Sequence, residues 1–149
     1  MPRPLLLTLS LLLPSCGQSP PSGPPTTNTI STTLPTLAQR ITFLNQYVTF
    51  RRSYDTLDFN IAFLNNSRGT LPGPTEYDIR LIATVPESEL QSWVPAGITA
   101  TSTALDTSWL KSVPTTLNLT GVTEWYITPG KQVGLDRANK TVVYRANSQ

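Results

Sequence analysis

Apolar and polar residues alternate most regularly in the middle of the chain. Apolar side chains occupy every second position from Leu57 to Phe63 and again from Tyr77 to Ala83. A period of two is typical of a β-strand with one buried face. Residues 65–75, between the two runs, are rich in Asn, Gly and Pro. Because these residue types favour turns, the pattern predicts an antiparallel hairpin with a long loop.

The C-terminal part of the chain contains three shorter segments with strand character. They are EWYIT at 124–128, KQVGLD at 131–136 and TVVYRA at 141–146. Pro129 and Gly130 separate the first two segments, and the polar sequence ANK precedes the third. Since such residues mark turns, these segments predict a meander of three strands.

Helical spacing precedes the first predicted strand. Thr36 and Gln39 fit a capping box, and apolar residues recur at helical intervals from Leu37 to Val48. This pattern predicts a short helix. The apolar and aromatic residues between positions 41 and 50 are also compatible with a strand, so both alternatives stand at this point.

Two further short helices are predicted at residues 86–95 and 106–114. The first begins with a proline, carries two glutamates near the positive end of its dipole and directs Trp93 to an apolar face. In the second, Asp106 is the expected N-cap and Trp109 is expected to point inward. A proline ends each segment.

These elements together predict an α+β domain at residues 37–149. It has an antiparallel sheet of about five strands, with two or three short helices packed on one face. A segment of roughly 110 residues is the size of one ordinary domain and can fold without disulfides. The only cysteine of the chain lies before this domain.

Residues 1–15 have the layout of a secretory signal peptide. One cation, Arg3, precedes a leucine-rich run from Leu5 to Leu13, and small residues follow. The run is shorter than the roughly 20 residues that a membrane-spanning helix requires. We therefore expect a cleaved signal and not a stable transmembrane anchor.

The sequence Leu13-Pro14-Ser15-Cys16 resembles the lipobox of bacterial lipoproteins. An aliphatic residue lies three positions before the cysteine, and a small residue lies directly before it. The resemblance implies cleavage before Cys16 and diacylation of its thiol, which would hold the protein on a membrane. Gly17, in place of Asp, resembles the pattern sorted to the outer membrane, so the expected location is the cell envelope, facing the periplasm or the cell surface. The alternative is an ordinary signal peptide, which would leave a free thiol.

Residues 16–36 form an uncharged segment rich in proline, serine and threonine. Such a composition buries too little apolar surface to order itself, and paired prolines extend it. We expect a disordered tether of up to roughly 60 Å between the lipid and the domain.

Charge and composition exclude several classes of function. The 11 basic and 9 acidic residues are scattered, and no basic cluster suits nucleic acid. The chain has no histidine, which is the commonest general base and metal ligand. The sequence contains no serine-nucleophile, metal-spacing or phosphate-loop motif. We therefore expect no catalytic residue, no metal and no cofactor.

Near pairs of acidic residues keep one enzymatic alternative open. The pairs are Asp55 with Asp58, Glu76 with Asp78, and Glu87 with Glu89. Two carboxylates are what glycoside hydrolysis requires, so the alternative is a small cell-wall or glycan hydrolase. Alternating charges such as those of Asp78 and Arg80 suit cross-strand ion pairs better than an acid and base.

The leading prediction is a lipid-anchored protein of the bacterial cell envelope whose domain binds a protein or glycan partner. It would serve as an accessory subunit, an inhibitor or an assembly factor. The candidate binding surface gathers charged and aromatic residues of the predicted hairpin and meander: Glu76, Tyr77, Asp78, Arg80, Trp125, Tyr126, Asp136 and Arg137.

Overall fold

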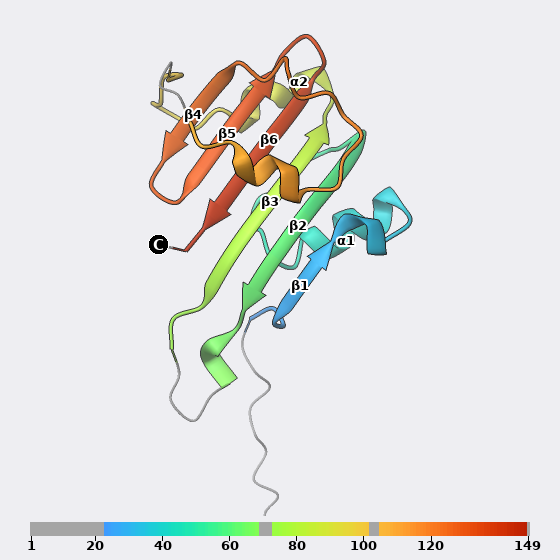
Figure 1. Ribbon diagram of the computed structural model, residues 1–149, viewed down its shortest axis with the longest axis vertical. Helices are drawn as coiled ribbons and strands as arrows, with labels where there is room; N and C mark the ends of the chain where they lie inside the picture. Colours follow the sequence, from blue (N-terminus) through green and yellow to red (C-terminus); the bar gives the residue numbers. More distant parts are fainter. Residues whose placement is uncertain (1–22, 69–72, 102–104, 149) are drawn as a thin grey trace, which may run out of the picture.

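Six strands form one antiparallel sheet in the order β1-β2-β3-β6-β5-β4 (Figure 1). The computed structural model describes residues 23–68, 73–101 and 105–148. The strands are β1 Thr27–Ile30, β2 Thr56–Leu64, β3 Glu76–Thr84, β4 Glu124–Thr128, β5 Lys131–Asp136 and β6 Thr141–Asn147. The α-helices are α1 Leu37–Leu44 and α2 Glu87–Leu90, and the 3-10 helices are η1 Ser31–Thr33, η2 Asn66–Arg68, η3 Gln91–Trp93 and η4 Ser108–Ser112.

The predicted hairpin and meander are both confirmed. Strand β2 pairs with β3, with Phe59 opposite Leu81, and β4, β5 and β6 pair in sequence order. The two units join through β3 and β6, where Leu81 lies opposite Tyr144. Alternation then places one apolar face of each strand in the larger core, which includes Phe59, Leu81 and Leu135.

The expected number of about five strands is corrected to six. Strand β1 lies in the segment predicted to be a disordered tether, and it pairs with β2 along the edge of the sheet. Its β-branched residues, among them Thr27 and Ile30, favour a strand, and the free edge of β2 supplies backbone partners. Ser31 is buried directly after β1. The ordered domain therefore begins before the expected boundary at residue 37, while Cys16 and the rest of residues 1–22 lie outside the described residues.

Helix α1 confirms the predicted capping box and excludes the strand alternative. The backbone N–H of Gln39 donates to Thr36 Oγ1, and the Thr36 N–H donates to Gln39 Oε1. Two of the unpaired N–H groups at the helix start are thereby satisfied. Leu44, at the end of α1, is fully buried against the sheet.

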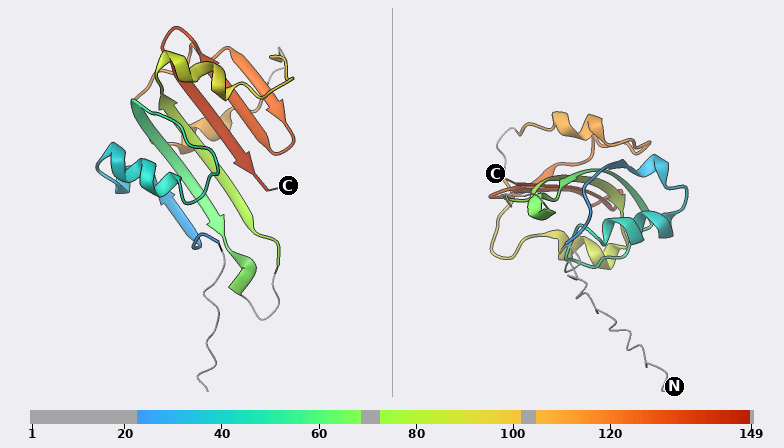
Figure 2. Two further views of the ribbon diagram at one scale, coloured as in Figure 1. Left: turned by 180° about the vertical axis from the view of Figure 1, so that it is seen from behind. Right: turned by 90° about the horizontal axis from the view of Figure 1, so that it is seen from below.

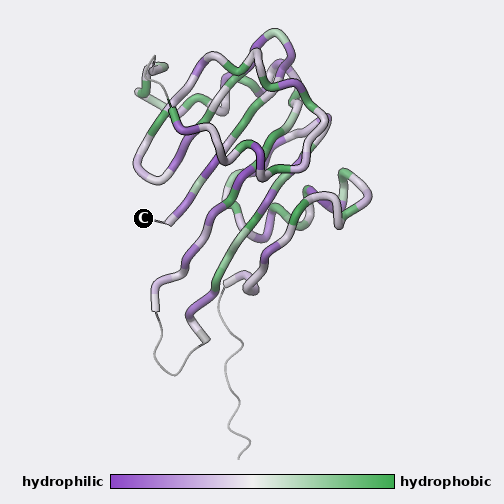
Figure 3. The backbone as a smooth tube through the Cα atoms, in the orientation of Figure 1, coloured by the Kyte–Doolittle hydropathy of each residue, from purple (hydrophilic) through white to green (hydrophobic). Residues whose placement is uncertain are grey.

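Helical segments cover both faces of the sheet, which corrects the prediction that they pack on one face. Helices α1 and α2 lie on one side, and η4 lies on the other, so that the molecule has three layers (Figure 2). Trp109 and Val113 in and beside η4 pack against Ile82 and Val143, which form a second apolar cluster. Strands β3 and β6 can accept this second layer because they carry apolar residues on both faces. Hydrophobic and hydrophilic residues are both found along these strands (Figure 3).

The chain changes face at the outer edge of the sheet. Thr101 forms an isolated antiparallel bridge with Trp125 in β4, and its N–H donates to the Trp125 carbonyl at 2.7 Å. The segment after η3 therefore reaches the β4 edge before η4 begins on the opposite side. Within the part of the chain that the structure describes, no helix is long and apolar enough to cross a membrane.

Candidate functional site

Strand alternation divides the predicted binding residues between the two faces of the sheet. In β3, Asp78 and Arg80 belong to the face covered by η4, together with the exposed Glu76, whereas Tyr77 packs against the larger core. In β4, Trp125 packs against the η4 cluster. The predicted residues thus do not form one continuous surface.

Asp78 is the centre of an ion-pair cluster with two arginines. Arg145 Nε and Nη2 donate to its two oxygens at 3.0 and 2.9 Å, and Arg80 Nη2 donates to Oδ2. Arg80 Nη1 also donates to Ser112 Oγ at 2.7 Å, which fastens η4 to the sheet. Burial disfavours ionisation of Asp78, but the hydrogen bonds from Arg145 and Arg80 outweigh it and lower the pKa of the carboxyl group.

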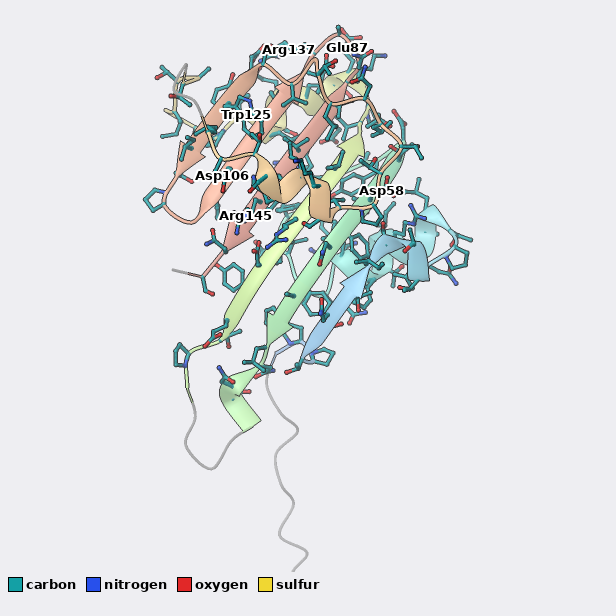
Figure 4. The ribbon with its side chains drawn as sticks, in the orientation of Figure 1. Asp58, Glu87, Asp106, Trp125, Arg137 and Arg145 are labelled. Carbon is teal, nitrogen blue, oxygen red and sulfur yellow. The ribbon has the colours of Figure 1, made fainter. Side chains whose placement is uncertain are left out.

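Arg145 is a member of this cluster that sequence reasoning missed. It lies opposite Arg80 across the β3–β6 pair. Both arginines donate to Asp78, whose negative charge offsets the repulsion between them. No local motif could have revealed it, because residues 78 and 145 meet only through strand order. Figure 4 shows Arg145 on the face of the sheet that also presents Asp106 and Trp125.

The charged residues near the β5–β6 turn of the meander form hydrogen bonds and ion pairs with neighbouring side chains. Arg137 Nε and Nη2 donate to the two oxygens of Glu124 at 2.7 and 2.9 Å, and this pairing lowers the pKa of Glu124. Tyr126 Oη donates to the same carboxylate. Asp136 is buried and accepts hydrogen bonds from the backbone and side chain of Asn139, which also lower its pKa. Asp136 therefore closes the β5–β6 turn.

Several carboxyl groups have an arginine partner, and four carboxyl groups have a lowered pKa. Arginine partners lie within 4.0 Å of four carboxylates: Asp58, Asp78, Glu89 and Glu124. The carboxyl groups with a shifted pKa are Asp78, Asp106, Glu124 and Asp136, and each shift is downward. A glycosidase needs the opposite for its general acid, whose pKa must be raised. Among the described residues, no group of three or more acidic, histidine or cysteine side chains is placed to hold a metal ion.

An aromatic cavity of about 360 Å³ opens on the opposite face, between η3 and the meander. We call it the aromatic cavity. Phe50 and Trp93 line it from the helical layer, and Tyr126, Val133 and Tyr144 line it from β4, β5 and β6. Its volume is at the lower end of the range of small-molecule sites, about 300–1,000 Å³. The elements that form it lie side by side when the sheet is seen from behind (Figure 2).

Three rings of the cavity contact one another edge to face. The Phe50 ring lies 5.3 Å from Trp93 and 5.5 Å from Tyr144 between centroids, with interplanar angles of 70° and 80°. Trp93 and Tyr144 lie 5.9 Å apart. Such contacts stabilise rings against reorientation. Burial raises the pKa of Tyr144 to about 12, so its hydroxyl is neutral at physiological pH.

The charged residues that line the cavity are both cations. Arg52 lies over the Trp93 ring at 5.4 Å from the centroid, and its Nη2 donates to the Ser92 carbonyl at 2.6 Å. Its Nη1 is 3.8 Å from Glu89, which balances part of its charge. Lys131 is exposed and has no ion-pair partner among the described residues. None of the described residues that line the cavity is acidic.

Two buried donors of the cavity residues have no hydrogen-bond partner in the part of the chain that the structure describes. They are Trp93 Nε1 and Arg52 Nε, and the Trp93 side chain is only 5% exposed. By contrast, Trp109 Nε1 donates to Gln132 Oε1 at 3.0 Å on the other face. An unsatisfied buried donor costs about 1–3 kcal/mol and is uncommon in folded proteins.

Sequence reasoning identified one residue of this cavity as part of a binding surface, Tyr126. The other principal members, Phe50, Arg52, Trp93, Lys131 and Tyr144, come from segments far apart in the chain. No spacing pattern links them, so only the fold brings them together. No family model, curated protein or solved structure matches this chain.

Proposed function

We propose that the chain is a lipid-anchored protein of the bacterial cell envelope whose domain binds a partner through the aromatic cavity. The observation that carries the binding role is the cavity itself, a site walled by aromatic rings and lined by two cations. Aromatic walls with a few polar groups are typical of binding sites. The anchoring role rests on the lipobox-like sequence that ends at Cys16.

Binding is supported over the hydrolase alternative by the state of the carboxylates. The ion pairs of Asp78 and Glu124 favour their ionised forms. An acid that must deliver a proton to a glycosidic oxygen needs an environment that favours its neutral form. The aromatic cavity, in turn, is lined by no carboxylate that could act on a bound glycan.

The anchoring role is tested by Cys16→Ser in a bacterial host. We expect the unaltered protein to fractionate with membranes and to carry the added mass of acyl chains, and the variant to lose both. Ser19→Ala, three residues further along, is the matched control and should behave as the unaltered protein. Membrane association that survives Cys16→Ser would contradict the lipid anchor.

The binding role is tested separately on the ¹⁵N-labelled protein. A low-molecular-weight extract of the host envelope should shift the indole N–H resonance of Trp93 and leave that of Trp109 in place. Trp109 is a suitable internal control because its Nε1 is already hydrogen-bonded to Gln132 on the opposite face. Equal behaviour of the two resonances, moving together or not at all, would contradict binding at the aromatic cavity.

A further inference from the structure

The charge of the aromatic cavity indicates which class of ligand it holds. Its lining includes two cations, Arg52 and Lys131, and no acidic side chain. Glu89 offsets Arg52 from outside the cavity, whereas Lys131 has no such partner in the described part of the chain. The lining therefore carries an excess of positive charge, which favours an anionic ligand.

The apolar walls of the cavity set a second requirement for the ligand. Phe50, Trp93 and Tyr144 contact one another through their edges, and Tyr126 and Val133 continue the apolar lining. A fully hydrated inorganic anion gains nothing from such walls. A ligand with a flat apolar body gains binding free energy, because its own apolar surface and that of the walls are both removed from water. The gain is about 25 cal/mol per Å² of buried apolar surface.

Two buried donors beside the cavity have no acceptor among the described residues. The Trp93 side chain is 95% buried, lines the cavity and leaves its indole N–H without an acceptor. Arg52 Nε, in the side chain stacked on the same ring, also lacks one. Both nitrogens have almost no exposed surface, so they do not themselves select a ligand, but the Trp93 indole belongs to a wall of the cavity and therefore reports on its occupancy.

From the charge and the walls of the cavity we infer that it binds a small organic anion, a carboxylate carried on an aromatic or similarly flat apolar body. This inference rests on the proposed binding role and narrows it to one class of ligand. The apolar body packs against the wall formed by Phe50, Trp93 and Tyr144, and the carboxylate is oriented towards Lys131 and Arg52.

The test uses two probes of the same shape, 2-naphthoate and 2-naphthamide, because the first is ionised at pH 7 and the second is neutral. The protein is the full chain with Cys16→Ser, so that no attached acyl chain can enter the cavity. We expect 2-naphthoate to shift the Trp93 indole resonance and not that of Trp109, and to bind more tightly than 2-naphthamide.

Lys131→Gln and Lys111→Gln form the matched pair of variants. Both lysines are exposed, but Lys131 lines the cavity and Lys111 lies in η4 on the other face. We expect Lys131→Gln to weaken 2-naphthoate binding by about three- to tenfold and to leave 2-naphthamide unchanged. Lys111→Gln should change neither.

The outcomes separate the two proposals. Equal affinity for both probes, or no effect of Lys131→Gln, would overturn the preference for an anion while leaving the cavity as a binding site. Failure of 2-naphthoate to shift Trp93 would overturn the inferred ligand class, and the envelope extract would then decide whether the cavity binds anything else.

Discussion

Asp78 holds two arginines that would otherwise repel each other. Arg80 and Arg145 lie opposite one another on neighbouring strands, and the carboxylate accepts hydrogen bonds from both. Like charges directly opposite in a sheet are destabilising, so the cluster depends on the ionised form of Asp78. The alternation of Asp78 and Arg80 predicted a cross-strand ion pair. In the structure Asp78 pairs with Arg80 within β3 and with Arg145 across the β3–β6 pair.

Asp78→Asn is expected to lower the free energy of unfolding by about 1–3 kcal/mol at pH 7, because it leaves two half-buried arginines without their anion. The pKa of Asp78 is lower in the folded than in the unfolded protein, so this stabilisation is present at neutral pH and is lost as the pH falls through the folded-state pKa. Urea denaturation at pH 7 and near pH 3 measures the difference in the free energy of unfolding between the variant and the unaltered protein. This difference should be smaller at the lower pH. The exposed Asp55→Asn is the control, and an equal loss in both variants would contradict the role of the cluster.

The segment from η4 to β4 forms the second helical layer, and a glycine in β5 makes room for it. Gly134 lies beneath this layer, where an added Cβ would be 2.6 Å from Val143 Cγ2, 2.7 Å from Val122 Cγ1 and 2.9 Å from Trp125 Cζ3. Such distances are too short for any real contact. The periodicity of residues 106–114 showed which side of that segment is apolar, but it could not show which face of the sheet would receive it.

Gly134→Ala should therefore destabilise the domain by about 1–3 kcal/mol through overpacking. Gly73→Ala is the matched control, since a Cβ there would be 3.6 Å from the nearest atom, Asn66 Cβ, and that is an ordinary contact. Thermal unfolding followed by near-ultraviolet circular dichroism measures both. If the two variants unfold at the same temperature, the close packing of the η4 layer on β5 is contradicted.

The domain as a whole includes more of the N-terminal segment than its composition suggests. Strand β1 pairs with β2 through four residue pairs, from Thr27 opposite Phe63 to Ile30 opposite Asn60. Ser31, fully buried, donates to Asp58 Oδ1 at 3.3 Å, and Asp58 also pairs with Arg40 of α1. Residues 27–31 are therefore tied to the sheet and, through Asp58, to the first helix.

A chain that begins at residue 37 should be less stable than one that begins at residue 23, by about 2–4 kcal/mol. The shorter chain loses the backbone hydrogen bonds of β1 and the Ser31 contact, and each net hydrogen bond contributes roughly 1 kcal/mol. It also exposes β2 as a long edge strand, which favours aggregation. Chemical denaturation of the two chains, with sedimentation to detect association, tests this. Equal stability would place the domain boundary at residue 37 after all.

The sequence by itself determined most of the local elements, because their signals lie within a few residues of one another. It missed β1, whose strand depends on pairing with the distant β2. The period of two gave β2 and β3, the Pro-Gly turn separated β4 from β5, and the Thr36–Gln39 cap started α1. Only the tertiary structure decided the strand order, the faces on which the helices pack, the Arg145–Asp78 pair and the aromatic cavity. These depend on contacts between segments far apart in the chain, and neither periodicity nor residue spacing encodes which distant segments meet.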